Sequence, residues 1–162
     1  MPAVDTPTTF RGMQVCGFGF AGSDLRRELV DLVMAGTKTA TAGLAVELEL
    51  DNEIMPTPGF REAVIDADDR IVGVIETTEC GVVRMADVDD QFARDEGEGF
   101  ADAADWRAAH ERFWNGYIGE LRGRLGDPAF TLTDDTPIIC QRFRLVERYP
   151  DPIPVSADAS PA

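Results

Sequence analysis

Hydrophobic positions near the start of the chain predict one amphipathic helix. Apolar residues recur at helical spacing at Leu25, Leu29, Leu32 and Val33. Ser23 precedes this run as a favourable N-cap, and a glycine at position 36 is typical of the position just past a helix end. The pattern therefore predicts a helix that begins after Ser23 and presents these four residues to a core.

The next segments have the patterns of strands and turns. Residues 37–50 begin irregularly and then alternate apolar and polar positions, which indicates a strand. The Pro-Thr-Pro-Gly sequence at 56–59 breaks the chain, and residues 67–70 have the composition of a hairpin turn. The strands predicted on either side of that turn are 63–66 and 71–78, and 82–83 extend the second one.

The second half of the chain mixes helices with a final strand. Residues 87–95 indicate a short helix, and Asp102 opens a longer one whose apolar stripe runs from Trp106 to Leu121. The last strand is expected from Ile138 to Val146, and the composition then shifts to Pro, Ala, Asp and Ser. Without βαβ regularity, the order of elements favours an α+β fold with a small barrel or curled sheet. We expect an irregular lead-in at 1–15, one domain at 16–149 and a disordered tail at 150–162.

Composition narrows the classes of partner. The chain has 162 residues and a net charge of −15, so its surface repels polyphosphate at long range and argues against duplex DNA as a partner. A single nucleoside or a short single-stranded RNA remains compatible with this charge. No apolar run suits a membrane span, and the N-terminus lacks the pattern of a secretory signal, so we expect a cytoplasmic protein. The three cysteines are far apart and form no CxxC pair, which indicates buried or unreactive thiols and not a metal site or a disulfide. We expect no metal and no cofactor.

Lys38 is the first candidate for chemistry. It is the only lysine among fifteen basic residues, and a lysine, unlike an arginine, can lose its proton when it is desolvated. It stands in the segment Gly-Thr-Lys-Thr-Ala-Thr at 36–41, just past the predicted helix. Lys38 and Thr41 would point to opposite faces of a straight strand, so they share a pocket only if the chain turns between them. A solvated lysine in a threonine-rich strand is the alternative.

Five segments, in this order, resemble the ASCH-domain family. They are LVMAGTKTATAGL at 32–44, VIETTE at 74–79, FARDEGEG at 92–99, WRAAHERFW at 106–114 and CQRFRLV at 140–146. The resemblance implies a PUA-like fold, a small β-barrel with flanking helices. It also implies an association with RNA and modified nucleosides, and one branch is similar to amidohydrolases that deacetylate N4-acetylcytidine.

The resemblance to that branch implies a catalytic role for three residues. Lys38 would be the base, Thr41 the nucleophile and Glu96 the proton donor. A lysine–carboxylate pair ~4 Å apart gains about 4 kcal/mol at an effective dielectric near 20, which favours the charged forms of both groups. Two roles for Lys38 therefore stay open, namely a neutral base or a fixed cation that stabilises an oxyanion. A non-catalytic module that binds RNA or a modified nucleotide, and a metal-dependent ribonuclease, are the alternative functions.

Other polar residues are secondary candidates. Thr39, Glu76 and Arg142 are expected to contact substrate, with a solvated strand face as the alternative for Glu76 and a surface ion pair as the alternative for Arg142 and its neighbour Arg144. His110 lies in a stripe of aromatic residues, where a packed histidine is the expectation. The acids between 87 and 98 lack calcium-loop spacing and are interpreted as a solvated face, with Glu96 as the exception.

Overall fold

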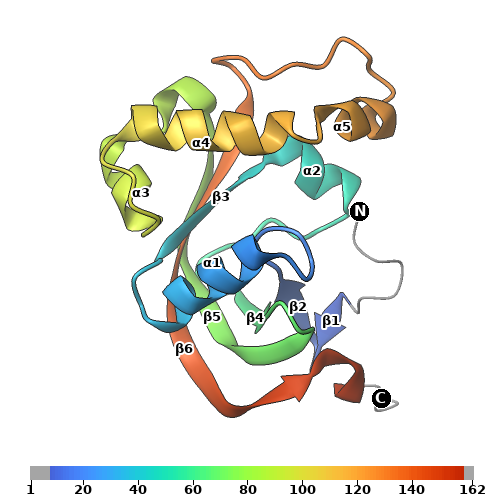
Figure 1. Cartoon of the computed structure of the whole chain (residues 1–162), viewed down its shortest axis with the longest axis vertical. Helices are drawn as coiled ribbons and strands as arrows, with labels where there is room; N and C mark the ends of the chain where they lie inside the picture. Colours follow the sequence, from blue (N-terminus) through green and yellow to red (C-terminus); the bar gives the residue numbers. More distant parts are fainter. Residues whose placement is uncertain (1–7, 159–162) are drawn as a thin grey trace. The chain divides into compact units, whose positions relative to one another are not determined.

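The computed structural model describes residues 8–158, in which short helices accompany one mixed sheet (Figure 1). The strands, in hydrogen-bonded order, are β1-β2-β4-β5-β6-β3, and this order does not close into a barrel. The α+β, PUA-like class is thereby confirmed. The strands are β1 (Thr9–Phe10), β2 (Met13–Cys16), β3 (Ala40–Leu44), β4 (Arg61–Ile65), β5 (Arg70–Arg84) and β6 (Pro137–Pro154). The helices are α1 (Asp24–Met34), α2 (Ala45–Leu50), α3 (Asp90–Asp95), α4 (Ala103–Asn115) and α5 (Ile118–Leu125), with 3₁₀ turns η1 (Met85–Asp87) and η2 (Val155–Asp158).

Residues 8–158 divide into two compact units. The first unit holds residues 8–39, 57–78 and 143–158, and the second holds residues 40–56 and 79–142. The long strands β5 and β6 each contribute to both units.

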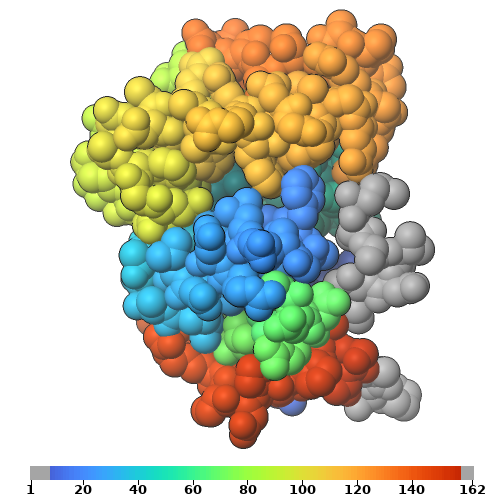
Figure 2. Space-filling view, viewed as in Figure 1, coloured from blue at the N-terminus to red at the C-terminus, as the bar shows by residue number. Residues whose placement is uncertain are grey.

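In the first unit, helix α1 confirms the predicted boundaries, and its buried face shares Val33 and the partly buried Leu29 with the predicted one. The Ser23 hydroxyl caps it by accepting a hydrogen bond from the backbone N–H of Arg26 at 3.0 Å. The fully buried side chains are those of Arg26, Val30 and Val33, so the buried face is rotated away from Leu25. The β4–β5 turn is the predicted hairpin. Asp66 Oδ1 accepts from the backbone N–H groups of residues 68 and 70, each at 2.9 Å, and the turn lies against α1 (Figure 2).

Both ends of the described chain carry structure that the sequence did not predict. Positive φ angles at Arg11 (49°) and Gly12 (79°) form a tight turn between β1 and β2, where an irregular lead-in was expected. The tail predicted from residue 150 instead continues β6 to Pro154. Its prolines fall at alternate positions, so the missing N–H donors share one edge of the strand. Val155 is buried in a cluster with Phe10. Residues 1–7 and 159–162 lie outside the described range.

In the second unit, β3 pairs antiparallel with the first part of β6, and the alternation at 45–50 proves to be a helix. Ala, Leu and Glu are strong helix formers, and Val46 and Leu50 are also one helical turn apart. The predicted strand over that segment is therefore wrong. The short helix predicted at 87–95 is divided, because Asp89 caps a separate helix, α3, by accepting from Phe92 N at 2.7 Å.

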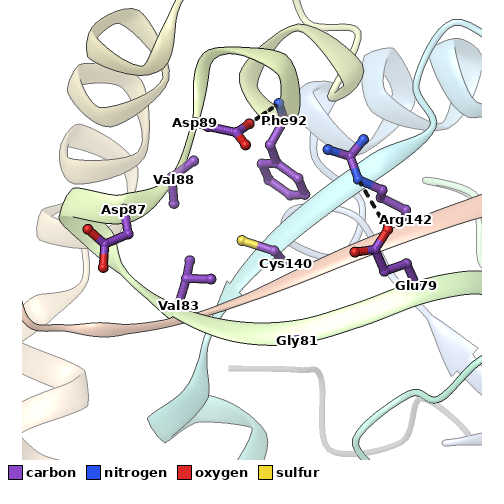
Figure 3. Close-up of a pocket in the computed structure, with 9 residues that line it drawn as sticks. All are labelled: Glu79, Gly81, Val83, Asp87, Val88, Asp89, Phe92, Cys140 and Arg142. Atoms are coloured by element: carbon purple, nitrogen blue, oxygen red, sulfur yellow. Dashed lines mark hydrogen bonds and ion pairs between the residues drawn. The ribbon is translucent and has the colours of Figure 1, made fainter.

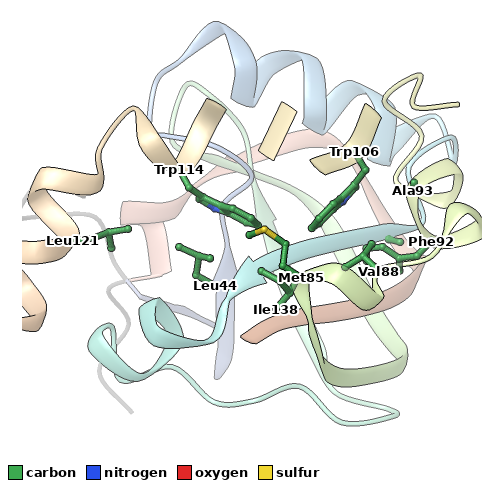
Figure 4. Close-up of a cluster of buried hydrophobic side chains, with 10 residues drawn as sticks. Leu44, Met85, Val88, Phe92, Ala93, Trp106, Trp114, Leu121 and Ile138 are labelled. Atoms are coloured by element: carbon green, nitrogen blue, oxygen red, sulfur yellow. The ribbon is translucent and has the colours of Figure 1, made fainter. Parts of the chain in front are cut away.

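The long helix predicted from Asp102 is two helices. Asp102 caps α4 as expected, but the helix ends at Asn115 and α5 begins at Ile118. Both halves of the apolar stripe still reach one core, in which Trp106 and Trp114 of α4 lie against Leu44 and Ile138 (Figure 4). The aromatic side chains of this helix therefore form a core.

Candidate functional site

Lys38 lies at the junction between α1 and β3, and its side chain is buried. Its backbone N–H donates to the carbonyl of Leu32 at 3.1 Å, after a glycine at 36 with φ of 77° has turned the chain. Only 2% of Lys38 is exposed, which excludes the solvated lysine that the sequence left open. The ammonium nitrogen stands 5.9 Å from the ring centroid of Phe18. The Phe18 ring is therefore part of the surroundings of the Lys38 nitrogen.

Arg26 holds the loop that carries Phe18. Its Nε donates to the carbonyl of Phe18 at 3.2 Å and its Nη2 donates to the carbonyl of Gly19 at 2.8 Å. Gly17 leaves room for this guanidinium, because a Cβ there would stand 2.4 Å from Arg26 Nη2. Arg26 was not identifiable from the sequence, since a buried arginine on a helix has no signature that separates it from a surface arginine. The closely spaced glycines at 17 and 19 were the available signal.

Thr41 lies in β3 and is half-buried. Its cross-strand partner is Gln141, so these two side chains share one face, whereas Ala40 and Ala42 point to the other face with Cys140. Thr39 is exposed, and its carbonyl accepts from the backbone N–H of Phe143 at 2.9 Å. Lys38 precedes the strand at a helix–strand junction, so strict alternation does not apply to its position relative to Thr41.

Glu96 is the C-cap of α3 and is almost fully buried, with 1% exposed. Its Oε2 stands 3.2 Å from His110 Nε2. The His110 ring stacks on Trp106 at a centroid distance of 4.3 Å and lies 5.2 Å from the Trp114 ring. The packed histidine that the sequence predicted is confirmed, but its contact with Glu96 was missed because no spacing rule links a helix cap to a later helix.

The predicted site residues fall in both units. Lys38 belongs to the first, and Thr41 and Glu96 belong to the second. The structure places each of them within its own unit, and the convergence of all three in one pocket stays a prediction.

The secondary candidates are engaged in ion pairs. Glu76 Oε2 accepts from Arg61 Nε at 2.9 Å and its Oε1 accepts from Arg144 Nη2 at 2.8 Å. Hydrogen bonds from these two guanidinium groups lower the pKa of Glu76. Arg142 is hydrogen-bonded to Asp95 and lies 4.0 Å from Glu79. For Arg142 and Arg144, the sequence left a surface ion pair as the alternative to substrate binding, and the structure shows such pairs for both residues.

A cavity of about 170 Å³ opens in the second unit beside Arg142 (Figure 3). The guanidinium of Arg142 stands 5.4 Å from the Phe92 ring centroid, and Cys140 lies on the cavity wall. Burial, reinforced by the negative charge of Glu96, raises the pKa of Cys140 to about 12, so its thiol stays protonated at neutral pH and is a poor nucleophile.

Within residues 8–158, no group of three or more His, Cys, Asp or Glu side chains has an arrangement that could hold a metal ion. Over the same range, no helix is both long and apolar enough to cross a membrane.

Comparison with known proteins identifies the family. A model of the ASCH domain matches residues 15–147, and the chain therefore belongs to the ASCH-domain family. The match includes segments of both units. No curated protein matches the chain.

Two solved structures share the fold. One is a protein from Enterococcus faecalis assigned to the family DUF984, with a TM-score of 0.73 and 25% identity over 88% of this chain and 81% of that chain. The other is an ASCH domain from Lactobacillus crispatus, with a TM-score of 0.67 and 24% identity over 83% of this chain and 79% of that chain.

Proposed function

We propose that this ASCH-domain chain hydrolyses the amide of an acylated nucleoside such as N4-acetylcytidine, with Lys38, Thr41 and Glu96 as its catalytic residues. The observation that carries the proposal is the burial of Lys38 and Glu96, which are among the largest fully buried side chains. Removing an ammonium and a carboxyl group from water costs several kcal/mol, and ionisable groups buried at such a cost are often found at functional sites. The resemblance of the segments 36–41 and 92–99 to the amidohydrolase branch points to the same three positions.

The proposed reaction proceeds through an acyl-enzyme. The Thr41 hydroxyl attacks the acetyl carbonyl carbon and transfers its proton to the neutral amine of Lys38. The carbon–nitrogen bond then breaks, Glu96 gives its proton to the leaving N4 nitrogen, and cytidine departs. Water attacks the threonine ester, acetate leaves, and the protons return to Glu96 and Thr41. The sum is N4-acetylcytidine plus water giving cytidine plus acetic acid, which ionises at neutral pH.

Substrate contacts are assigned to three further residues. Thr39 is exposed next to Lys38, and we assign its side chain to the sugar or base. We propose Arg142 and Glu76 as weaker contributors, because each would exchange an ion-pair partner for the substrate.

The test is a direct assay of cytidine release from N4-acetylcytidine by the purified chain. We expect Thr41→Val and Glu96→Gln to lower kcat by at least about 100-fold, the usual contribution of a nucleophile's activation or a general acid. Thr37→Val and Glu49→Gln are matched controls, because both residues are exposed. Turnover by Thr41→Val at the parental rate would refute the assignment.

Two other outcomes would redirect the conclusion. Binding of N4-acetylcytidine without any turnover would make the chain a nucleoside-binding module. Cleavage of single-stranded RNA that stops on addition of a chelator would support the ribonuclease alternative.

A further inference from the structure

Gln141 is a buried amide directly opposite the proposed nucleophile. Strands β3 and β6 pair antiparallel, and in their register Thr41 faces Gln141. Directly opposite residues on such strands project to the same face of the sheet, with their Cβ atoms about 4.5–5.5 Å apart. Only 6% of Gln141 is exposed, although glutamine is mostly a surface residue. The pairing therefore places a desolvated amide beside Thr41.

The hydrophobic core of the second unit does not account for this amide. Leu44 and Ile138, which are paired on the same two strands, lie in the core with Trp106 (Figure 4). Side chains alternate between the two faces of a strand, so Thr41 and Gln141 project to the face that points away from this core. A buried polar pair on that face has a reason other than core packing.

Open space adjoins Thr41 on the same face. Gly43 follows Thr41 by two residues and therefore shares its face, and the cross-strand partner of Gly43 is the buried Ile139. A Cβ added at Gly43 would meet no heavy atom within 4 Å. An acyl group can therefore lie over this glycine, next to an apolar residue, while its carbonyl carbon meets the Thr41 hydroxyl.

We propose that Gln141 is a further catalytic residue, whose amide N–H donates to the carbonyl oxygen of the acyl group that Thr41 attacks. This role rests on the proposed function. As Thr41 Oγ bonds to the carbonyl carbon, the π electrons of the C=O bond move onto oxygen, and an N–H held beside that oxygen stabilises the charge. The electrons return when the carbon–nitrogen bond breaks, so Gln141 itself is unchanged at the end.

The chemistry of an amide suits this position. A glutamine side chain carries two N–H donors and one carbonyl, so it can stay anchored to the protein and still direct an N–H at the substrate. A donor that is already fixed and desolvated acts more strongly on a developing charge than the same group in water. With an oxyanion donor on β6, Lys38 is needed for proton transfer rather than for stabilising the oxyanion.

A sulfur-for-oxygen exchange in the substrate tests this contact. N4-thioacetylcytidine has C=S in place of C=O, and sulfur is a weak hydrogen-bond acceptor. Gln141→Met keeps the length of the side chain and removes both N–H donors. We expect it to lower kcat on N4-acetylcytidine about 100- to 1,000-fold with KM little changed, because an oxyanion contact strengthens in the transition state. On the thioacetyl substrate we expect a loss below about 10-fold.

The same exchange tests the unaltered protein, which covers the case in which Gln141→Met does not fold. Each enzymatic rate is divided by the rate of hydroxide-catalysed hydrolysis of the same compound, which removes the difference in intrinsic reactivity. The parent should then prefer the acetyl over the thioacetyl substrate by about 100-fold or more. Gln91→Met is the matched control, because Gln91 is exposed on α3, and it should keep the parental preference.

The outcomes separate this role from the proposed function. Equal losses of kcat on both substrates in Gln141→Met would show a merely structural glutamine, because a distorted site handles both compounds poorly. A parent without preference for the acetyl substrate, or parental kcat in Gln141→Met, would also overturn the role of Gln141 while leaving the hydrolase intact. A parent that hydrolyses neither compound would refute the proposed function and the role of Gln141 together.

Discussion

Arg26 offers the sharpest test of how the chain fixes the surroundings of Lys38. The perturbation is Arg26→Met, which keeps the apolar stem and removes the guanidinium that holds the Phe18 and Gly19 carbonyls. The bond to Phe18 is buried, and the bond to Gly19 is partly buried. The loop should therefore lose its anchor while the helix packing is kept.

The size of the effect follows from these two bonds. A buried carbonyl left without a donor costs about 1–3 kcal/mol, and the partly buried one can recover a bond to water. We expect a loss of about 2 kcal/mol in the free energy of unfolding. For a chain of this length that lowers Tm by about 4–8 °C.

The assay is thermal and urea unfolding followed by tryptophan fluorescence. Arg27→Met is the matched control, since Arg27 is the next residue in α1, is 54% exposed and makes one 3.7 Å ion pair with Asp68. An exposed pair of this kind contributes up to about 1 kcal/mol and often nothing measurable. Equal losses in Arg26→Met and Arg27→Met would refute the argument.

Gly17 allows a second check on the same contact. Gly17→Ala places a Cβ 2.4 Å from Arg26 Nη2, so the guanidinium must shift from its position beside the two carbonyls. We expect a cost of about 1–3 kcal/mol in the parent and less than about 0.5 kcal/mol in the Arg26→Met background. Additive costs in this double-mutant cycle would show that the glycine is needed for another reason.

Three further predictions address individual ionisable groups. Burial raises the pKa of Glu47, although the 2.5 Å hydrogen bond from Tyr117 opposes the shift. A carboxyl group with a raised folded pKa stabilises below its unfolded value of 4.5, and that contribution is lost as pH rises through the folded pKa. Glu47→Gln should therefore gain stability relative to the parent between pH 4 and pH 7 in urea unfolding, and a pH-independent difference would contradict this. Cys140, with its pKa raised to about 12, should be alkylated at pH 8 more than about 100-fold more slowly than an ordinary thiol by mass spectrometry, because so little of it is thiolate, and an ordinary rate would contradict this. Lys38→Arg should be as inactive on N4-acetylcytidine as Lys38→Met if the residue is a base, and retained activity in Lys38→Arg alone would assign it to oxyanion stabilisation.

Local signals in the sequence account for much of the fold. Ser23 and Asp102 were identifiable as caps because a short polar side chain before an apolar periodic run satisfies the first N–H groups of a helix. The hairpin at 66–70 was readable for a similar reason, since Asp66 bonds to the backbone of its own turn. Segments of the ASCH type in the right order identified the family and made Lys38 a candidate.

Contacts between residues that are far apart in the sequence determined the parts of the fold that local signals did not predict. The segment 45–50 satisfies both a strand and a helix pattern, and its packing against the second-unit core selects the helix. β6 continues past its prolines because Tyr149, Ile153 and Val155 pack near Phe10, far away in the sequence.

The burial of Lys38 and the pairing of Glu96 with His110 are also tertiary facts. A lone lysine, a glutamate in an acidic stretch and a histidine among aromatics were each visible in the sequence. Composition alone gave no reason to expect the first two to be excluded from water, or the last two to lie 3.2 Å apart. The sequence determined which chemical groups are present, and only the folded chain decided which are desolvated and which lie in contact, because desolvation and contact depend on neighbours that sequence spacing does not specify.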